Sequence, residues 1–380
     1  SLHDALPIFL AAYLSLHGKP VPNSLKKGLG LSLSKFNAYQ LAKYKGNNKG
    51  VKLVDLFNLV HPKPNAENAK AFKDLMEGNL ASTDTWESEL SEAGQTDSEV
   101  EKAANKAEAW ERLISENKLG YFALLRNLRN IIQQGTAKTI DLACKALVNE
   151  KAIKKSLVLP FRYMTALEEL EKLPSDSTTR KVTEAVEKAI EIALDNVPSF
   201  EGETLIALDV SGSMMGGYAG TQKGTKSPAA IGSMFGAVIA KKNNADFLMF
   251  DGTARYVTYR SSDSVAGITQ GLRSKFTGGS TDFKTIFTTA NKKYDRVIIL
   301  SDMQGWVGGY CPTAAFAAYC ARFKAAPRIY SFDLTGNGTT QFPSDKISCL
   351  AGFSEKTLDL MKVLEEDPNA LLKKIQAVEF

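Results

Sequence analysis

The feature that most constrains this chain is a short apolar run that ends in an acid. Residues 204–208 read Thr-Leu-Ile-Ala-Leu, and Asp209 follows directly. A short apolar run bounded by turn residues is typical of a buried strand in a parallel sheet. A carboxylate at the end of such a strand is costly to bury without a partner. Ser211 and Ser213 follow at alternate positions, so three hard oxygen ligands can meet at the mouth of a sheet, where Mg²⁺ can bind.

Two later segments supply further oxygen ligands. The glycine-rich segment 275–282 leads into a helical stretch and offers the hydroxyl of Thr281 or of the adjacent Ser280. A second buried-strand pattern, at 296–300, is followed by Asp302. The alternative interpretation is that the two aspartates cap helices and that the serines form turns.

These three segments, in this order and on these elements, resemble the metal-ion-dependent adhesion site of von Willebrand factor A (vWA) domains. The resemblance favours Thr281 over Ser280. It implies a divalent cation, Mg²⁺, held by five side chains: Asp209, Ser211, Ser213, Thr281 and Asp302.

The secondary-structure pattern changes at residues 198–202. Before this point the periodicity is helical throughout, with one helix expected over 119–134 and others over 136–149, 160–172 and 177–196, which predicts an α-solenoid of helix pairs. After it, helices alternate with strands expected at 204–208, 246–250, 254–258, 296–300 and 328–333. We therefore predict a multi-domain α and α/β chain, with a helical domain over residues 1–199 and a doubly wound α/β domain over residues 200–380.

Positive charge is concentrated near the start of the chain. The formal net charge of the whole chain is only +5, but residues 1–63 hold nine lysines against two acids, Asp4 and Asp55. Clustered positive charge indicates a polyanionic partner. The alternative is a solvated lysine-rich surface, although such surfaces usually carry interspersed glutamates and none precedes Glu67.

Histidine and cysteine usage excludes several enzyme classes. The four cysteines form no Cys-x-x-Cys pair, and only three histidines are present. A zinc site or a Ser-His or Cys-His hydrolase is therefore not expected. The cysteines are typical of reduced, mostly buried thiols, and with no run of about 18–20 apolar residues we expect a cytoplasmic protein that makes no membrane contact. Because the chain does not begin with Met, we give residues 1–8 no functional weight.

The helical half resembles the TROVE module (telomerase, Ro, vault). The resemblance covers about residues 20–170 and is carried by blocks at 25–28, 41–45, 55–64, 85–91, 116–120, 125–131 and 159–162. A vWA domain after a TROVE module is the architecture of the Ro autoantigen and its bacterial relatives.

This resemblance implies an RNA-binding protein that is neither an enzyme nor a DNA-binding protein. In the family, HEAT-like helices form a ring that the vWA domain closes. Small structured non-coding RNAs (Y RNAs) lie on its basic outer surface, and single-stranded ends of misfolded RNAs enter its hole. Bacterial relatives can tether an exoribonuclease through the Y RNA. The helical part here is shorter than a full ring requires, so surface binding is the firmer expectation.

Charge and resemblance together select candidate RNA-binding residues. Lysines bind phosphates as point charges, and the candidates are Lys26, Lys27, Lys43, Lys45 and Lys63. His61 matches an RNA-contacting position of the family, and its alternative is a helix C-cap. Arg126, Arg129 and Arg162 complete the set, and the alternative for the first two is a salt bridge between solenoid layers.

Two other functions remain as alternatives. The runner-up is a metal-dependent protein-binding adaptor, in which an acid of a protein partner completes the Mg²⁺ shell at the vWA domain. A metal-dependent hydrolase ranks last, because the expected ligands are partly neutral hydroxyls and no general base is evident nearby.

Overall fold

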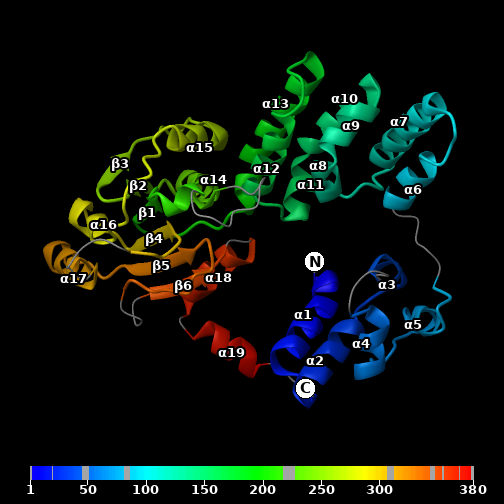
Figure 1. The fold of residues 1–380 in the computed structure, drawn as a ribbon, viewed down its shortest axis with the longest axis horizontal. Helices are drawn as coiled ribbons and strands as arrows, with labels where there is room; N and C mark the ends of the chain where they lie inside the picture. The colour runs from blue at the N-terminus through cyan, green and yellow to red at the C-terminus, as the bar shows by residue number, and fades with distance from the viewer. Residues whose placement is uncertain are drawn as a thin grey trace. The chain divides into compact units, whose positions relative to one another are not determined.

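The computed structural model describes most of the chain. The described residues are 2–18, 20–44, 51–80, 86–216, 227–305, 312–342, 347–352, 355–367 and 369–377. They belong to two compact units, one formed by Ser1–Ala109 with Lys373–Phe380 and the other by Trp110–Leu372 (Figure 1). No helix within these ranges is long and apolar enough to cross a membrane.

The first unit is helical up to residue 109. Its helices are α1 (Leu2–His17), α2 (Asn23–Leu33), α3 (Ala38–Tyr44), α4 (Leu53–Val60), α5 (Ala69–Met76), α6 (Trp86–Ala93) and the first part of α7 (Glu99–Ser115). In α4, Leu53, Leu56 and Phe57 recur at helical spacing and are all buried. They share a core with apolar residues of α1, α2 and α5, so helical periodicity alone accounts for the packing here.

The second unit opens with short helices. They are α8 (Tyr121–Arg126), α9 (Leu128–Gln134), α10 (Ala137–Leu147), α11 (Glu150–Ser156), α12 (Pro160–Leu170) and α13 (Ser177–Ala193), followed by the 3₁₀ turn Leu194–Asn196. The single helix expected over 119–134 is wrong, because it breaks at Asn127. The Asn127 amide donates to the Ala123 carbonyl at 2.9 Å, a local bond of the kind that competes with the helical ladder.

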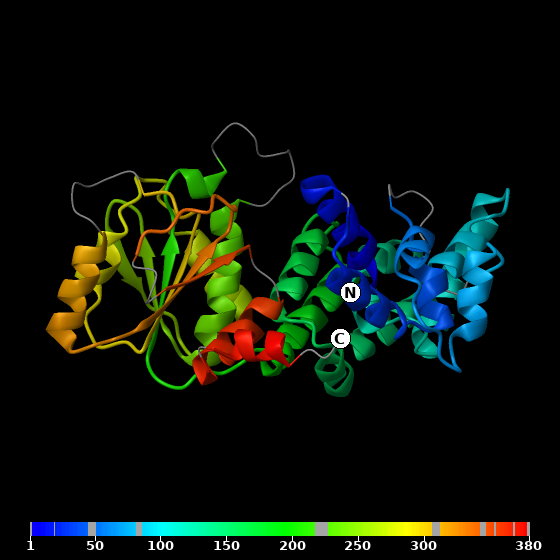
Figure 2. The ribbon, with the colours of Figure 1, turned by 90° about the horizontal axis from the view of Figure 1, so that it is seen from below.

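A six-stranded sheet follows in the order β3-β2-β1-β4-β5-β6 (Figure 2). Its strands are β1 (Thr204–Asp209), β2 (Asp246–Phe250), β3 (Ala254–Val257), β4 (Arg296–Ser301), β5 (Arg328–Asp333) and β6 (Ile347–Ala351). All neighbours pair in parallel except β2 and β3. The doubly wound α/β prediction is confirmed, and β6 is a strand that the sequence did not predict.

Helices cover both faces of the sheet. The helices of this region are α14 (Pro228–Asn243), α15 (Val265–Arg273), α16 (Lys284–Thr289), α17 (Pro312–Phe323), α18 (Glu355–Glu366) and α19 (Ala370–Gln376). Leu205 and Ala207 of β1 pack with α16 and α17. On the other face α14 approaches so closely that a Cβ on Gly232 would lie 2.5 Å from the Leu208 side chain, so a larger residue there would require this side chain to shift.

The last helices before the sheet pack on α14 and α15. Phe161 of α12 lies 6.0 Å from Phe235 of α14 between ring centroids. Arg273 of α15 pairs with Glu168 of α12 at 3.0 Å. The boundary expected at residues 199/200 therefore coincides with the change in secondary structure, while the second compact unit contains helices from both sides of it.

Candidate functional site

The carboxyl ends of β1 and β4 form the candidate metal centre. These two parallel strands are neighbours, and β1 also pairs with β2 on its other side, so the strand order reverses at this point. Open α/β sheets bind ligands at such a switch point. Asp209 ends β1 and Asp302 directly follows β4, and both are buried. The fold thus brings together the two acids that the sequence singled out.

Asp209 is held by short local contacts. Its Oδ1 accepts the Ser211 amide at 2.9 Å, and its Oδ2 accepts the Ser301 hydroxyl at 2.6 Å. Burial raises the pKa of Asp209 to about 6, the hydrogen bonds from Ser211 and Ser301 oppose this rise, and the negative charge of Asp302 adds to it. The hydroxyls of Ser211 and Ser213 lie 3.3 Å apart. Asp209 is thus a buried acid that accepts hydrogen bonds from Ser211 and Ser301 and interacts electrostatically with Asp302.

Asp302 sits on a strained turn. Its Oδ1 accepts the Gln304 amide at 3.0 Å, and its backbone carbonyl accepts the Asn337 side chain at 2.9 Å. The next residue, Met303, has a φ of 59°, which is costly for a non-glycine residue. Neither Asp209 nor Asp302 caps an α-helix, since both accept amides two residues on in turns, so the capping alternative is not found.

The glycine-rich loop lies against the end of β1. Gly212 donates to the Gly279 carbonyl at 2.8 Å, and Gly278 donates to the Val210 carbonyl at 2.9 Å. Thr281 is buried at 3% exposure, whereas Ser280 is exposed. The loop therefore brings a buried hydroxyl, that of Thr281, to the same strand end.

Asp251, which follows β2, fixes this loop and was missed by the sequence analysis. Its Oδ2 accepts the Thr277 hydroxyl at 2.5 Å, and its carbonyl accepts the Asp282 amide at 3.0 Å. A Cβ on Gly279 would lie 2.9 Å from this same oxygen. The signal was available, because residues 246–250 followed by Asp251 repeat the pattern of an apolar strand ending in an acid.

The donor set at the two strand ends suits a hard cation. Within the described ranges no ion pair joins Asp209 or Asp302 to a lysine or arginine. No three His, Cys, Asp or Glu side chains cluster there as a metal site either. A set of two carboxylates and three hydroxyls is, however, a combination that Mg²⁺ accepts together with water. The residues present therefore fit such an ion.

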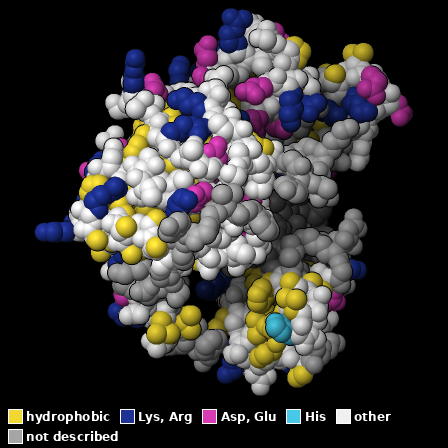
Figure 3. All heavy atoms as spheres, turned by 60° about the vertical axis from the view of Figure 1, so that its left-hand side comes forward, with side chains coloured by type: hydrophobic (Ala, Val, Ile, Leu, Met, Phe, Trp, Pro, Cys, Tyr) yellow, Lys and Arg dark blue, Asp and Glu magenta, His cyan; other side chains and the backbone are white. Residues whose placement is uncertain are grey.

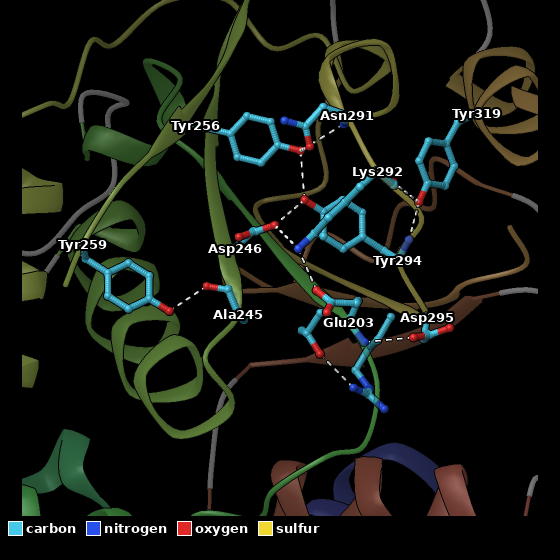
Figure 4. A network of polar contacts seen from close by, with 12 residues as sticks. Glu203, Ala245, Asp246, Tyr256, Tyr259, Asn291, Lys292, Tyr294, Asp295 and Tyr319 are labelled. Carbon is cyan, nitrogen blue, oxygen red and sulfur yellow. Dashed lines mark hydrogen bonds and ion pairs between the residues drawn. The ribbon is translucent and has the colours of Figure 1, made fainter. Parts of the chain in front are cut away.

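The amino ends of the strands, opposite the candidate metal centre, carry a different polar network (Figure 4). Lys292 pairs with Glu203 at 2.7 Å and with Asp246 at 2.9 Å. The Tyr294 hydroxyl also donates to Asp246, at 2.7 Å. The hydrogen bonds to Glu203 and Asp246 raise the pKa of Lys292. Here Glu203 and Asp246 already have cationic or hydroxyl partners.

The candidate lysines lie in the first unit. Lys27 and Lys63 are exposed and Lys26 is half-buried. The side chain of Lys43 and all of Lys45 lie outside the described residues. His61 ends α4 in the left-handed region, with a φ of 46°, and its amide donates to the Phe57 carbonyl at 2.9 Å. The capping alternative for His61 thus holds for its backbone, while its side chain is exposed.

The three candidate arginines come together at one cavity. Arg126, Arg129 and Arg162 line a hollow of about 340 Å³ between α8, α9 and α12. No described ion pair joins Arg126 or Arg129 to a carboxylate, so the interlayer salt bridge is not found. The exposed Phe122, which the sequence analysis missed, lies at the same cavity.

Basic side chains on the face shown in Figure 3 are dispersed. On the face shown in Figure 3, the coloured Lys and Arg side chains occur singly or in small groups among Asp and Glu. Among the side chains drawn in colour there, no continuous basic surface forms.

Of the cysteines, Cys144 and Cys320 are half-buried and Cys349 is exposed, so the expectation of mostly buried thiols is wrong for these three.

The helical array, the mixed sheet and the acid-hydroxyl cluster at its switch point define a vWA domain preceded by a helical module. Comparison with known families gives the particular class. A family model described as the TROVE domain matches residues 76–197, and one described as the Ro60 vWA domain matches residues 203–364. The chain therefore carries a TROVE domain followed by a Ro60-type vWA domain, and it is homologous to the Ro protein of Deinococcus radiodurans.

Individual relatives agree with this assignment. "RNA-binding protein RO60" of Deinococcus radiodurans is 26% identical over 244 residues, which are 60% of this chain and 45% of that protein. "Telomerase protein component 1" of Mus musculus is 34% identical over 121 residues, 32% of this chain and 4% of that protein. The crystal structure of the Deinococcus radiodurans Ro (RSR) protein matches 95% of this chain and 80% of that chain, with a TM-score of 0.64 and 20% identity, and so shares the fold. Of the two curated relatives named above, the chain matches 45% and 4% of the length, so it spans less than half of either.

Proposed function

We propose that this protein binds RNA, as a scaffold for small structured non-coding RNA. The observation that carries the proposal is the order of the two domains, TROVE and then Ro60-type vWA, shared with a relative whose name describes an RNA-binding protein. The lysine-rich first 63 residues support it, because clustered lysines bind phosphates. The ends of misfolded RNAs are a second RNA class within the same proposal.

The proposed RNA contacts are distributed over both units. They are Lys26, Lys27, Lys43, Lys45, His61 and Lys63 in the first unit, and Arg126, Arg129 and Arg162 in the second. The exposure of Lys27, His61 and Lys63 supports this role, as does the clustering of the arginines at one cavity.

A salt titration of RNA binding tests the proposal. A structured small RNA is titrated with the full chain in an electrophoretic mobility shift assay at 50 and at 200 mM salt. If about five phosphates are neutralised, the affinity should fall about 10²- to 10³-fold over this range. Absence of a shift at low salt, or an affinity that salt does not change, would contradict the proposal.

We further propose that Asp209, Ser211, Ser213, Thr281 and Asp302 hold a divalent cation, Mg²⁺. The two buried acids at the ends of neighbouring strands and the hard oxygen donors support this assignment. A bound cation there would supply a Lewis-acidic position for an acidic side chain of a protein partner, such as an exoribonuclease. We propose a binding role and no catalytic one, and nuclease activity that Asp302→Ala abolishes would overturn that part.

A further inference from the structure

The cavity between α8, α9 and α12 has an apolar floor and a cationic rim. Leu125, Leu128 and Leu170 line it and are buried at 2%, 2% and 1% exposure. Around them stand the exposed side chains of Arg126 and Arg162. A floor that excludes water below a charged rim suits a ligand with one flat apolar part and one anionic part.

Phe122 stands between two guanidinium groups that come from different helices. Its ring centroid lies 5.7 Å from Cζ of Arg126 on α8 and 5.9 Å from Cζ of Arg162 on α12. The ring is 42% exposed, although large aromatic side chains are usually well buried. An exposed aromatic ring flanked by guanidinium planes is an arrangement on which nucleobases stack.

The charge of the cavity is not balanced from within. Glu169 is its acidic lining residue, and it pairs with Lys172. The neighbouring Glu168 pairs with Arg273 at 3.0 Å. In the part of the chain that the structure describes, Arg126 and Arg129 have no carboxylate partner. Guanidinium groups clustered at one cavity attract an anion, and their planar donor sets match the oxygens of a phosphate.

The geometry points to a nucleoside monophosphate moiety as the ligand: we propose that one unpaired nucleotide places its base against Phe122 and its phosphate on Arg126, Arg129 and Arg162. The volume of about 340 Å³ is near the lower end of the roughly 300–1,000 Å³ of ligand pockets, which fits one nucleotide and not a folded RNA element. This inference rests on the proposed RNA-binding function, because that function makes RNA the source of the nucleotide. The same moiety also occurs in a free nucleotide.

Two RNA probes and one mononucleotide separate the possibilities. The probes are a blunt RNA hairpin, the same hairpin with a single-stranded extension, and adenosine monophosphate. Binding of the full chain is measured by fluorescence anisotropy for the RNAs and by calorimetry for the nucleotide. We expect the extended hairpin to bind more tightly than the blunt one.

Variants of the stacking residue carry the test. Phe122→Leu should weaken binding of the extended hairpin about 5- to 100-fold, the loss of one base stack, and leave the blunt hairpin unchanged. Phe122→Tyr keeps an aromatic ring and should retain binding. Arg126→Lys keeps the charge but loses the planar donor set, so it should weaken binding of the extended hairpin more than binding of the blunt one. Arg180→Ala, at an exposed arginine of α13, is the control and should change nothing.

The outcomes distinguish this inference from the proposed function. If both hairpins bind and Phe122→Leu does not alter the preference for the extension, the cavity assignment is overturned while RNA binding stands. If neither hairpin binds, the proposed function fails. Binding of adenosine monophosphate then decides whether the cavity is a nucleotide site. Binding of adenosine monophosphate that Phe122→Leu abolishes supports the cavity as a site for free nucleotides, and binding that the variant leaves unchanged overturns it.

Discussion

Acids at the amino and carboxyl ends of the strands, which we call the amino edge and the carboxyl edge of the sheet, have opposite kinds of partner. At the amino edge, Glu203 and Asp246 share Lys292, and Arg296 forms a two-point pair with Glu365 at 2.8 and 2.7 Å. At the carboxyl edge, Asp209 and Asp302 are both buried and interact electrostatically, and among the described residues neither forms an ion pair with a lysine or arginine. Acids that already have cations hold strands together, whereas acids that lack them leave room for an external ion. The contrast separates a structural edge from a binding edge.

The largest effect should come from breaking the amino edge. Arg296 is 3% exposed and also donates to Thr204 at 2.8 Å. Arg296→Met would leave Glu365 without its partner in a partly buried position, so unfolding should become easier by roughly 3–5 kcal/mol. Denaturant titration followed by circular dichroism measures this. Lys292→Met, at a side chain 43% exposed, should cost less than about 1 kcal/mol, and equal costs for both variants would remove the distinction.

The carboxyl edge should respond to metal instead. Mg²⁺ at about 100 times its dissociation constant should stabilise the wild type by roughly 2.7 kcal/mol, because the ion binds only the folded chain. Asp209→Asn removes a charged ligand and should abolish this gain, as measured by thermal melts with Mg²⁺ and with chelator. Asp246→Asn, the matched change at the other edge, should retain it. A wild type whose melting is indifferent to Mg²⁺ would count against the cation site.

A smaller effect should separate two neighbouring hydroxyls. Thr281 is buried beside the strand end, whereas Ser280 is exposed. The Ser280 Oγ lies 2.7 Å from the position that a Cβ on Gly252 would occupy. Thr281→Ala should therefore weaken Mg²⁺ binding about tenfold, or roughly 1.4 kcal/mol, while Ser280→Ala should stay within a factor of about two of the wild type. Calorimetric titration of both variants decides which hydroxyl belongs to the site, and the reverse result would exchange their roles.

The smallest effect is a pH dependence at the amino edge. Burial would raise the pKa of Glu365, but the hydrogen bonds and charge of Arg296 outweigh it and hold that pKa below its ordinary 4.5. A carboxyl whose pKa is lower in the folded state stabilises the fold fully at pH values above its unfolded-state pKa. This contribution is lost as the pH falls through the folded-state pKa. The stability difference between the wild type and Glu365→Gln should thus be largest near pH 7 and shrink below about pH 4.5. A difference that stays constant down to pH 3 would contradict the pair.

The sequence predicted the sheet better than it predicted which acids cooperate. Apolar runs ending in acids mark β1, β2, β4 and β5 alike. Asp333, the last residue of β5, accepts three backbone amides, from Thr335, Gly336 and Gly338, and Asp251 accepts threonine groups. Only the fold shows that Asp333 accepts from its own loop, and that Asp251 accepts from its own loop and from the glycine-rich loop. Local sequence cannot reveal this, because the partners depend on how each loop turns back.

Elements with few buried residues were also missed. Strand β6 is half-exposed along its length, so its alternation is weak. Helix α11 buries only Ile153. The cavity between α8, α9 and α12 could not be predicted for another reason. Phe122 and Arg162 lie on helices that three other helices separate in the sequence. Helical periodicity indicates which face of a helix is buried, but it does not indicate which helices pack together.

The bond pattern of the glycine-rich loop has a practical consequence. Gly212 and Gly278 already fasten it to the end of β1, and Asp251 fastens it from the next strand. The backbone of the loop is therefore already held at the strand end, and binding of the proposed ion at Thr281 would require no rearrangement of the main chain. Loading and stripping of magnesium should accordingly be fast, reversible events that leave amide exchange in the sheet untouched.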